Sequence, residues 1–225
     1  MIDFDRNYIE TYTIQDAWRE VMDLCVTNGY DYIVEKGSYE GQIRRQLRNV
    51  VIKIKEPWLR PLAPIMPPNI PPPTTDEKIE FYFQHYLVED IVEENEEYTY
   101  GSFIKSQLGK IIDSLNVSNG NSNHGCITVG DKNSPFLTHA PCLKVVDFKV
   151  VNSKLDLTVF FRSWDLFTGL PENLGGLQML KEYALAQLTF PCEDGELIAY
   201  SSGLHIYEQY FDLVNLLNVK KIEKK

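Results

Sequence analysis

The sequence predicts a protein of mixed helix and strand content that folds as a single domain over residues 1–225. Segments with apolar residues at helical spacing are interspersed along the chain with runs rich in β-branched residues. Apolar residues make up 44% of the sequence and charged residues 24%, which is ordinary for a globular protein. A chain of 225 residues is long enough for one sizeable domain with a buried core or at most two small ones, and it contains no internal repeat.

Apolar periodicity predicts helices over residues 12–29, 76–93, 102–115, 171–188 and 205–217. The first helix is expected to bury Ile14, Ala17, Trp18, Val21, Met22 and Cys25. The third is expected to bury Phe103, Ile104, Leu108, Ile111, Ile112 and Leu115, and the fourth Leu177, Leu180, Ala184 and Leu188. Asp76 is a candidate cap for the second helix, and the acidic run from Glu89 to Glu97 is expected to be its solvated end.

Strands are predicted where β-branched and aromatic residues gather, at Val50–Ile54, Cys126–Val129, Leu143–Val151, Lys154–Phe161 and Leu197–Tyr200. The polar residues 37–45 and the segment Ser201–Gly203 are expected to be loops. Between Pro61 and Pro73, seven of thirteen residues are proline, which excludes helix and central strand. We expect an extended surface connector at 61–73, and the alternative is a ligand for a proline-binding partner.

The strands Leu143–Val151 and Lys154–Phe161 are predicted to pair as an antiparallel hairpin. Asn152-Ser153 between them is a turn signal, and facing residues in such a hairpin have numbers that sum to a constant, here about 305. Cys142 should therefore lie opposite Arg162 and Ser163, within one residue of register. A thiol, a guanidinium and a hydroxyl are predicted to converge at the open end of this hairpin.

Cys142 differs from the other three cysteines in having a predicted cationic neighbour. A fixed positive charge favours the nucleophilic thiolate, and arginine stays protonated in proteins. Arg162, with Ser163, is also suited to binding a phosphate through charge-assisted hydrogen bonds. The alternative is an inert, buried cysteine, which is how we interpret Cys25, Cys126 and Cys192. No C-x-x-C spacing occurs, so neither a disulfide framework nor a metal site is predicted.

Several motifs occur together in an order and spacing similar to the thymidylate synthase signature. They are Tyr98-Thr99-Tyr100-Gly101, Pro141-Cys142, Arg162-Ser163-x-Asp165, Gly169-Leu170-Pro171-x-Asn173 and His205-x-Tyr207. The match covers roughly residues 100–215, and the short chain resembles the compact, archaeal-type branch of the family. The resemblance implies an α+β (α/β) fold, a mixed-sheet sandwich with a large bent sheet backed by helices. It also implies twofold homodimers that pair through that sheet.

The resemblance further implies a reaction. Cys142 adds to C6 of a pyrimidine nucleotide monophosphate, and C5 then attacks the one-carbon unit of 5,10-methylenetetrahydrofolate. Hydride transfer from the folate completes the methyl group, which converts dUMP to dTMP. Arg162 and Ser163 hold the 5′-phosphate, while Arg162 also supports the thiolate. Asn173 reads the uracil edge, because an amide presents both a donor and an acceptor.

Other residues receive roles from the same resemblance. Asp165 is expected to bind the folate pterin, His205 and Tyr207 the deoxyribose 3′-hydroxyl, and Tyr100 is expected among the catalytic residues. Arg45, flanked by Arg44 and Arg48, is the candidate N-terminal phosphate ligand, and Glu89 the candidate catalytic glutamate. From spacing alone the alternatives are plainer: Asp165 and Asn173 as caps, His205 and Tyr207 as buried residues bonded to backbone, and the arginines as a solvated basic face.

The chain departs from the family pattern at several positions. His124-Gly125 stands where the family usually has an arginine pair that reaches the partner subunit's phosphate, and Phe161 stands where a glutamine is usual. The tryptophan-rich folate-binding stretch and the C-terminal closing peptide are not recognisable. Two alternatives therefore stay open: a hydroxymethylase acting on a pyrimidine nucleotide (dUMP or dCMP/CMP), and a non-catalytic nucleotide-binding descendant. Asn173 favours uracil, since cytosine-specific relatives tend to carry aspartate there.

The formal net charge of −10 argues against broad contacts with nucleic acid or with an anionic membrane. No stretch approaches the ~18 consecutive apolar residues of a membrane span. The acidic N-terminal sequence MIDFDRNYIE does not resemble a signal peptide. A cytoplasmic location is therefore expected.

Overall fold

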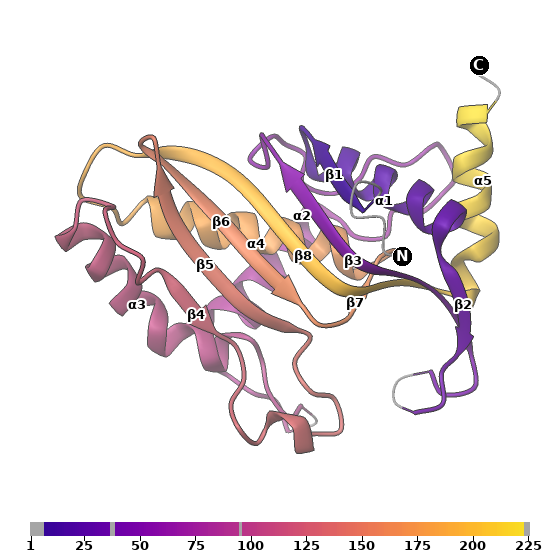
Figure 1. Ribbon diagram of the computed structural model, residues 1–225, viewed down its shortest axis with the longest axis horizontal. Coiled ribbons are helices and arrows are strands. Elements are labelled where there is room, and N and C mark those ends of the chain that lie inside the picture. Colours follow the sequence, from indigo (N-terminus) through magenta and orange to yellow (C-terminus); the bar gives the residue numbers. More distant parts are fainter. Residues whose placement is uncertain (1–6, 37–38, 95, 223–225) are drawn as a thin grey trace.

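The computed structural model describes residues 7–36, 39–94 and 96–222 (Figure 1). Within these residues, eight strands form one sheet: β1 (Tyr8–Thr11), β2 (Tyr30–Ile33), β3 (Ile43–Ile54), β4 (Cys126–Thr128), β5 (Leu143–Val151), β6 (Lys154–Phe161), β7 (Trp164–Asp165) and β8 (Glu193–Tyr207). The strand order is β1-β3-β8-β6-β5-β4, with β2 paired to β3 and β7 to β8. Three of the pairings, β1–β3, β6–β8 and β7–β8, are parallel and the others are antiparallel, so the predicted mixed sheet is confirmed.

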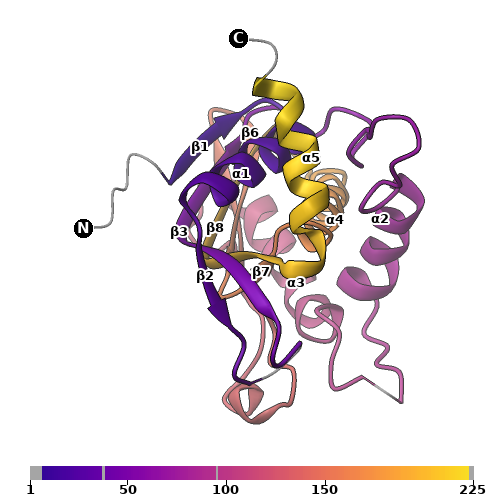
Figure 2. The same ribbon diagram turned by 90° about the vertical axis from the view of Figure 1, so that its right-hand side faces the viewer.

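The larger helices are α1 (Ile14–Asn28), α2 (Asp76–Tyr82), α3 (Gly101–Val117), α4 (Gly169–Leu185) and α5 (Phe211–Ile222). A π-helical segment, η2 (Phe83–Val88), continues α2, and short 3₁₀ turns occur at η3 (Ser134–Phe136) and η4 (Glu208–Tyr210). Figure 2 shows the sheet nearly edge-on, with α2, α3 and α4 gathered on one side of it. The fold is therefore a helix layer on one face of a bent mixed sheet, as the α+β class predicts.

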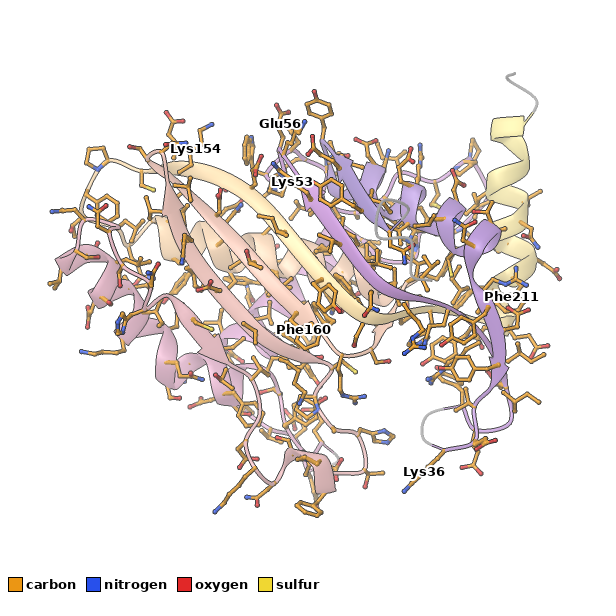
Figure 3. The ribbon with its side chains drawn as sticks, viewed as in Figure 1. Lys36, Lys53, Glu56, Lys154, Phe160 and Phe211 are labelled. Carbon is orange, nitrogen blue, oxygen red and sulfur yellow. The ribbon has the colours of Figure 1, made fainter. Side chains whose placement is uncertain are left out.

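The two faces of the sheet differ in their side chains. In β6, Leu155, Leu157, Val159 and Phe161 are fully buried beneath the helices, whereas the alternating residues between them are not. Figure 3 shows one of these alternating residues, Phe160, on the face that carries no helix. Period-two alternation is what a sheet covered on one side requires. Buried side chains from Ile14 to Val214 belong to one hydrophobic cluster, and the boundary of a single domain at 1–225 stays a prediction.

The first helix agrees closely with its prediction. All six residues expected on the inner face of α1 are buried. Its start is fixed by a capping box, in which the Thr13 hydroxyl accepts the Asp16 backbone N–H and the Asp16 carboxylate accepts the Thr13 N–H. In α3 the predicted inner face is also buried, apart from a half-buried Phe103.

Several predicted boundaries were wrong. The helix predicted over 76–93 ends at Val88, its cap is Thr75 rather than Asp76, and the acidic residues after it are not helical. The predicted loop at 37–45 is strand from Ile43 onward, and residues 37 and 38 lie outside the described part. In the proline-rich segment, Leu62–Pro64 are buried instead of lying on the surface.

The largest error concerns β8. A four-residue strand at Leu197–Tyr200 was predicted, followed by a loop and then a helix from His205. The observed strand runs from Glu193 to Tyr207 between β3 and β6, so both its edges are hydrogen-bonded by neighbours. Ser201–Gly203 lack strand propensity, but Ser201 pairs with both β3 and β6 and Gly203 pairs with β3, which outweighs local preference. The consequence is that His205 and Tyr207 lie on a rigid strand.

Candidate active site

The hairpin of β5 and β6 forms as predicted. Asn152 and Ser153 adopt left-handed φ values of 52° and 60°, and Val151 faces Lys154. The register then shifts by one between Leu143 and Val145, because a β-bulge leaves Lys144 without a partner on β6. At the open end, the Arg162 N–H donates to the Cys142 carbonyl over 2.9 Å. The predicted placement of Cys142 opposite Arg162 is confirmed.

The Arg162 side chain holds the segment that leads to Cys142. Its Nε donates to the Pro141 carbonyl at 3.0 Å and its Nη2 to the Ala140 carbonyl at 2.6 Å. Cys142 itself is half-buried and is a free thiol. The thiol is therefore not sealed in hydrocarbon, and a cation binds the backbone directly before it.

A group of tyrosines lies beside Cys142. The Tyr100 hydroxyl accepts the Leu143 N–H at 3.4 Å, and the Tyr100 ring meets Tyr86 edge-on, with 5.4 Å between ring centroids. Burial raises the pKa of Tyr100 well above its ordinary value, and the neighbouring Cys142 acts in the same direction. Burial likewise raises the pKa of Tyr98. Both phenols therefore remain protonated at neutral pH and can donate hydrogen bonds.

Packing explains why glycine follows tyrosine in the Tyr100-Gly101 element. A side chain at Gly101 would collide with the Glu89 carbonyl, so only glycine lets the start of α3 approach the end of η2 this closely. Glu89 caps η2 through its backbone, and its carboxylate pairs at 2.8 Å with the exposed His85. Among the described residues, Glu89 makes no hydrogen bond or ion pair with Cys142.

Asn173 and Asp165 lie at the start of α4. The Asn173 Oδ1 accepts the Trp164 indole N–H at 2.9 Å, and the buried Tyr82 hydroxyl lies nearby without completing a hydrogen bond. Asp165 Oδ1 accepts the Phe167 N–H, while its Oδ2 accepts the Thr168 hydroxyl and the Gly169 N–H. Asp165 thus folds the turn into α4, as the capping alternative predicted. Burial raises the pKa of Asp165, and its bond from Thr168 opposes that effect.

His205 and Tyr207 lie on β8 beside these residues. Asp165 pairs with His205 in the sheet, and the His205 and Tyr207 rings meet edge-on at 5.0 Å. Neither ring nitrogen of His205 has a hydrogen-bond partner among the described residues, although the side chain is only 3% exposed. Burial lowers the pKa of His205 to about 4, and the Arg44 charge acts in the same direction. The Gly203 backbone opposes both effects but lies outside hydrogen-bonding geometry with the ring.

The three N-terminal arginines occupy different surroundings. Arg44 faces Tyr207 across β3 and β8, and its Nη2 donates to the Tyr207 hydroxyl at 3.0 Å. Arg45 is held by Asp31 through two hydrogen bonds of 2.7 and 2.8 Å and stacks on Phe211, with the guanidinium 4.8 Å from the ring centre. Because neighbouring strand residues point to opposite faces, Arg45 lies away from Tyr207. Arg48 is exposed. Arg44 is therefore the arginine that the fold brings to the predicted site residues.

Two open pockets adjoin the tyrosines. One, of about 610 Å³, is lined by Glu77, Lys78, Phe81, Tyr82, Tyr86 and Glu172. The other, of about 390 Å³, is lined by Tyr86, Glu96, Glu97, Tyr98, Thr138 and His139. Tyr86 lines both pockets, and both it and Tyr98 lie within electrostatic range of Cys142. Cys142 is not among the residues that line either pocket, and the two pockets are linked to it through these tyrosines.

Some residues of this region were not predicted. The Glu97 carboxylate accepts the backbone N–H groups of Thr138 and His139 at 3.0 and 2.9 Å, and so fixes the loop before Cys142. The sequence feature that could have identified Glu97 is its position directly before the Tyr98–Gly101 motif. Trp164, between Arg162 and Asp165, was also overlooked as the group that orients Asn173. In the described part of the chain, no group of three or more His, Cys, Asp or Glu side chains is suited to hold a metal ion.

The fold and the site define an α+β protein that presents a half-buried cysteine, an arginine and polar strand residues at one end of a mixed sheet. The sequence model of the family described as thymidylate synthase matches residues 93–224, which is more than half of the chain. The chain belongs to the thymidylate synthase family.

Two archaeal relatives are distant in sequence but match over nearly the whole length. A protein of Methanosarcina barkeri named "Putative thymidylate synthase" is 28% identical over 214 residues, covering 92% of each chain. One of the same name from Methanothermobacter marburgensis is 25% identical, covering 94% of this chain and 95% of the relative. The solved structure of thermostable thymidylate synthase A from Bacillus subtilis has a TM-score of 0.67 at 16% identity, covering 91% of this chain and 83% of the other. This last similarity establishes the fold.

Proposed function

We propose that this chain converts dUMP to dTMP with 5,10-methylenetetrahydrofolate as co-substrate, using Cys142 as the nucleophile. The observation that carries the proposal is the clamp of Arg162 on Ala140 and Pro141, directly before a half-buried free thiol. A nucleophilic cysteine is favoured by a nearby fixed cation and must be accessible to substrate, and the Arg162 contacts directly before a half-buried thiol support both requirements. Membership of the family supports the same chemistry.

The proposed reaction proceeds through a covalent bond between Cys142 and the pyrimidine ring. The Cys142 thiolate forms a bond to C6 of the uracil ring, and the ring electrons move to C5 and O4. C5 then bonds to the one-carbon unit, loses its proton, and the folate nitrogen departs as leaving group. Hydride from the reduced folate reaches the exocyclic carbon as the Cys142–C6 bond breaks, so the folate leaves oxidised as dihydrofolate. The protonated phenols of Tyr98 and Tyr100 exclude water beside Cys142 and supply hydrogen-bond donors there.

Recognition of the nucleotide is proposed for residues around β7 and β8. Because the Trp164 indole can only donate, Asn173 Oδ1 must face it, which leaves the Asn173 amide N–H₂ as a donor for a ring carbonyl. Buried polar atoms are normally bonded, so the unpartnered ring nitrogens of His205 favour a ligand hydroxyl at that position. Arg162 and Ser163 are proposed to hold the 5′-phosphate. Arg44, rather than Arg45, is positioned to extend the site from Tyr207.

The co-substrate is proposed to enter the pocket lined by Phe81, Tyr82 and Tyr86. Flat heterocycles stack on aromatic side chains, and this pocket adjoins the turn that Asp165 fixes at the start of α4. Since three donors of its own loop already bind the Asp165 carboxylate, a contact of Asp165 with the pterin would use its remaining acceptor capacity.

Two copies of the chain are proposed to pair through the helix-free face of the sheet. Phe160 and Tyr200 stack there with their ring centroids 5.2 Å apart, between polar residues. Large half-buried aromatic residues on a face without helices are suited to a symmetric interface. No helix in the described residues has the length and apolarity needed to cross a bilayer. A cytoplasmic location, and the absence of nucleic-acid partners, stay predictions.

Adduct formation tests the proposal. Incubation with 5-fluoro-dUMP and methylenetetrahydrofolate should give a covalent ternary adduct, because fluorine at C5 blocks the later proton loss. Intact-mass measurement should detect the adduct in the wild type and in Cys126→Ser, whose exposed thiol serves as the matched control, and not in Cys142→Ser. An adduct that persists in Cys142→Ser would contradict the proposed nucleophile.

Product mass separates the neighbouring functions. With dUMP as substrate, a methyl product supports the proposal, and a hydroxymethyl product would replace it with capture of the exocyclic methylene by water. Binding of dUMP without either product would indicate a nucleotide-binding descendant.

A further inference from the structure

The β-bulge in β5 redirects one lysine. Lys144 is the additional residue between Leu143 and Val145, which pair with Phe161 and Phe160 of β6. A bulge places two successive residues on the same side of a strand and re-aims their side chains. Leu143 and Val146 remain in the core, whereas Lys144 and Val145 are both turned out of it. The bulge therefore directs the Lys144 side chain away from the core, two residues after Cys142.

The redirected lysine lies beside the candidate site and has no acidic partner. Its Nζ lies close to Gly130, and the Arg162 and Cys142 groups are within electrostatic range of it. Burial lowers the pKa of Lys144, and Arg162 lowers it further, while Cys142 acts in the opposite direction. No carboxylate of the described residues pairs with Lys144 in an ion pair. Asp131, in the loop that contacts Lys144, is occupied by the Asn133 and Ser134 N–H groups.

The two neighbouring cations, Lys144 and Arg162, repel each other unless a ligand supplies a compensating negative charge. This arrangement stands out because the whole chain has a net charge of −10. Arg162 uses Nε and Nη2 for Ala140 and Pro141, which leaves Nη1 without a bond to the described residues. The Ser163 hydroxyl is half-buried and makes no hydrogen bond within the same residues. A tetrahedral dianion can bind such a combination of guanidinium, hydroxyl and ammonium donors.

We propose that Lys144 binds the 5′-phosphate of the nucleotide together with Arg162, so that the bulge in β5 builds one side of the phosphate site. This inference rests on the proposed function in taking a nucleotide monophosphate as the ligand. It adds a residue to which neither spacing nor motif had assigned a role. The ammonium acts as a point charge, whereas Arg162 provides directed hydrogen bonds.

The test compares a nucleotide with its nucleoside. Dissociation constants of dUMP, dCMP and deoxyuridine would be measured by calorimetry for the wild type, Lys144→Gln, Lys144→Arg and Lys149→Gln. Lys149 is the matched control, because it lies on the same strand and bonds to Asn123 at 2.8 Å near the other end. Loss of one charge-assisted contact should weaken dUMP about tenfold or more in Lys144→Gln. Deoxyuridine binding should not change, and Lys144→Arg should retain most of the affinity.

Each result has a defined meaning. If the wild type binds dUMP or dCMP and Lys144→Gln binds it equally tightly, the role of Lys144 is overturned and the proposed function stays intact. Equal weakening of nucleotide and nucleoside would also overturn it, because the lysine would then act through the fold and not through phosphate. Failure of the wild type to bind either nucleotide would overturn the proposed function, and this inference with it. Melting temperatures of the four proteins show whether each variant is folded.

Discussion

At the scale of single residues, orientation decides what a side chain can recognise. Asn173 is oriented by Trp164, whose indole N–H can only donate and therefore fixes the amide oxygen. The amide nitrogen is then a donor toward the site, which suits a ring carbonyl such as O4 of uracil. Cytosine presents an amino group at the same position and requires an acceptor.

Asn173→Asp should therefore reverse the ring preference. A carboxylate still accepts the Trp164 N–H, so the fold is expected to persist, but it offers no donor to uracil. We expect the kcat/KM for dUMP to fall at least 100-fold, because a buried polar contact is lost, and the affinity for dCMP to rise. Steady-state kinetics and calorimetry with both nucleotides would measure this. An unchanged dUMP preference would show that Asn173 does not contact the ring.

His205 makes the stability of the unliganded protein depend on pH. Its pKa is about 4 in the folded state, against 6.5 for the unshifted group, so between these values the unfolded chain binds a proton that the folded chain does not. The stabilisation is complete above pH 6.5 and is lost as the pH falls toward 4, by about 3 kcal/mol in total. Urea titrations at several pH values should show this loss, and His205→Phe should reduce it. An equal pH dependence in both proteins would contradict the assignment.

The sequence predicted which residues lie near the site better than it predicted their side-chain contacts. The turn at Asn152-Ser153 and the two strands placed Cys142 opposite Arg162 by counting alone. Counting could not show that the Arg162 guanidinium binds backbone carbonyls, or that Asp31 holds Arg45, because those contacts depend on side-chain direction. Spacing offers a turn cap as the plainer role of Asp165, and the three donors on its carboxylate agree with it.

At the scale of elements, the hairpin turn stores backbone strain. Ser153 has a φ of 60°, a conformation that destabilises a non-glycine residue by about 1–2 kcal/mol. Ser153→Gly should relieve this, while glycine loses about 0.5–1 kcal/mol through greater freedom of the unfolded chain. We expect a net gain of about 0.5 kcal/mol in the free energy of unfolding, measured by denaturant titration. Ser153→Val should instead be destabilising, and stabilisation by valine would contradict the argument.

Helix α4 is joined to β8 by a buried ion pair. Lys181 is fully buried, lies 2.8 Å from the Asp194 carboxylate and donates to the Gly195 carbonyl at 2.5 Å. Removing one partner leaves a buried charge uncompensated, so Asp194→Ala should lower the free energy of unfolding by about 3–5 kcal/mol. The neighbouring Glu193 pairs with Lys154 at 4.0 Å on the surface. Glu193→Ala should change stability by less than about 1 kcal/mol, and equal effects of the two variants would refute this distinction.

At the scale of the whole molecule, the helix-free face is the surface to test for self-association. Phe160→Glu places a charge in the centre of the proposed interface without entering the helix-covered core. Sedimentation equilibrium should show a concentration-dependent dimer for the wild type and at least 100-fold weaker association for the variant. Phe136→Glu, on an 87% exposed side chain of η3, is the control and should remain dimeric. A monomeric wild type at micromolar concentration would contradict the proposed dimer.

The fold class followed from local patterns, whereas the extent of its central strand did not. Apolar spacing identified α1, α3 and α4. Helices α1 and α3 each bury one stripe, whereas α4 is buried on several sides, against the sheet and against α2. The residues of β8 alternate only weakly and include Ser201, Ser202 and Gly203, so its length depends on pairing with β3 and β6. The pairing with β3 joins segments more than 100 residues apart and that with β6 joins segments about 40 residues apart, and no local window contains that information.

The π-helical segment Phe83–Val88 also changes how positions along this part of the chain correspond to directions in space. Its hydrogen bonds span five residues rather than four, so each wide turn accommodates about one residue more than an α-helical turn. Side chains after Tyr82 are consequently rotated relative to those of a regular helix with the same starting point. Counting along a regular helix from α2 would therefore misplace the direction of each of these side chains by about one position. Which side chains of this segment face the neighbouring pocket, as Tyr86 does, follows from the three-dimensional structure and not from helical intervals in the sequence.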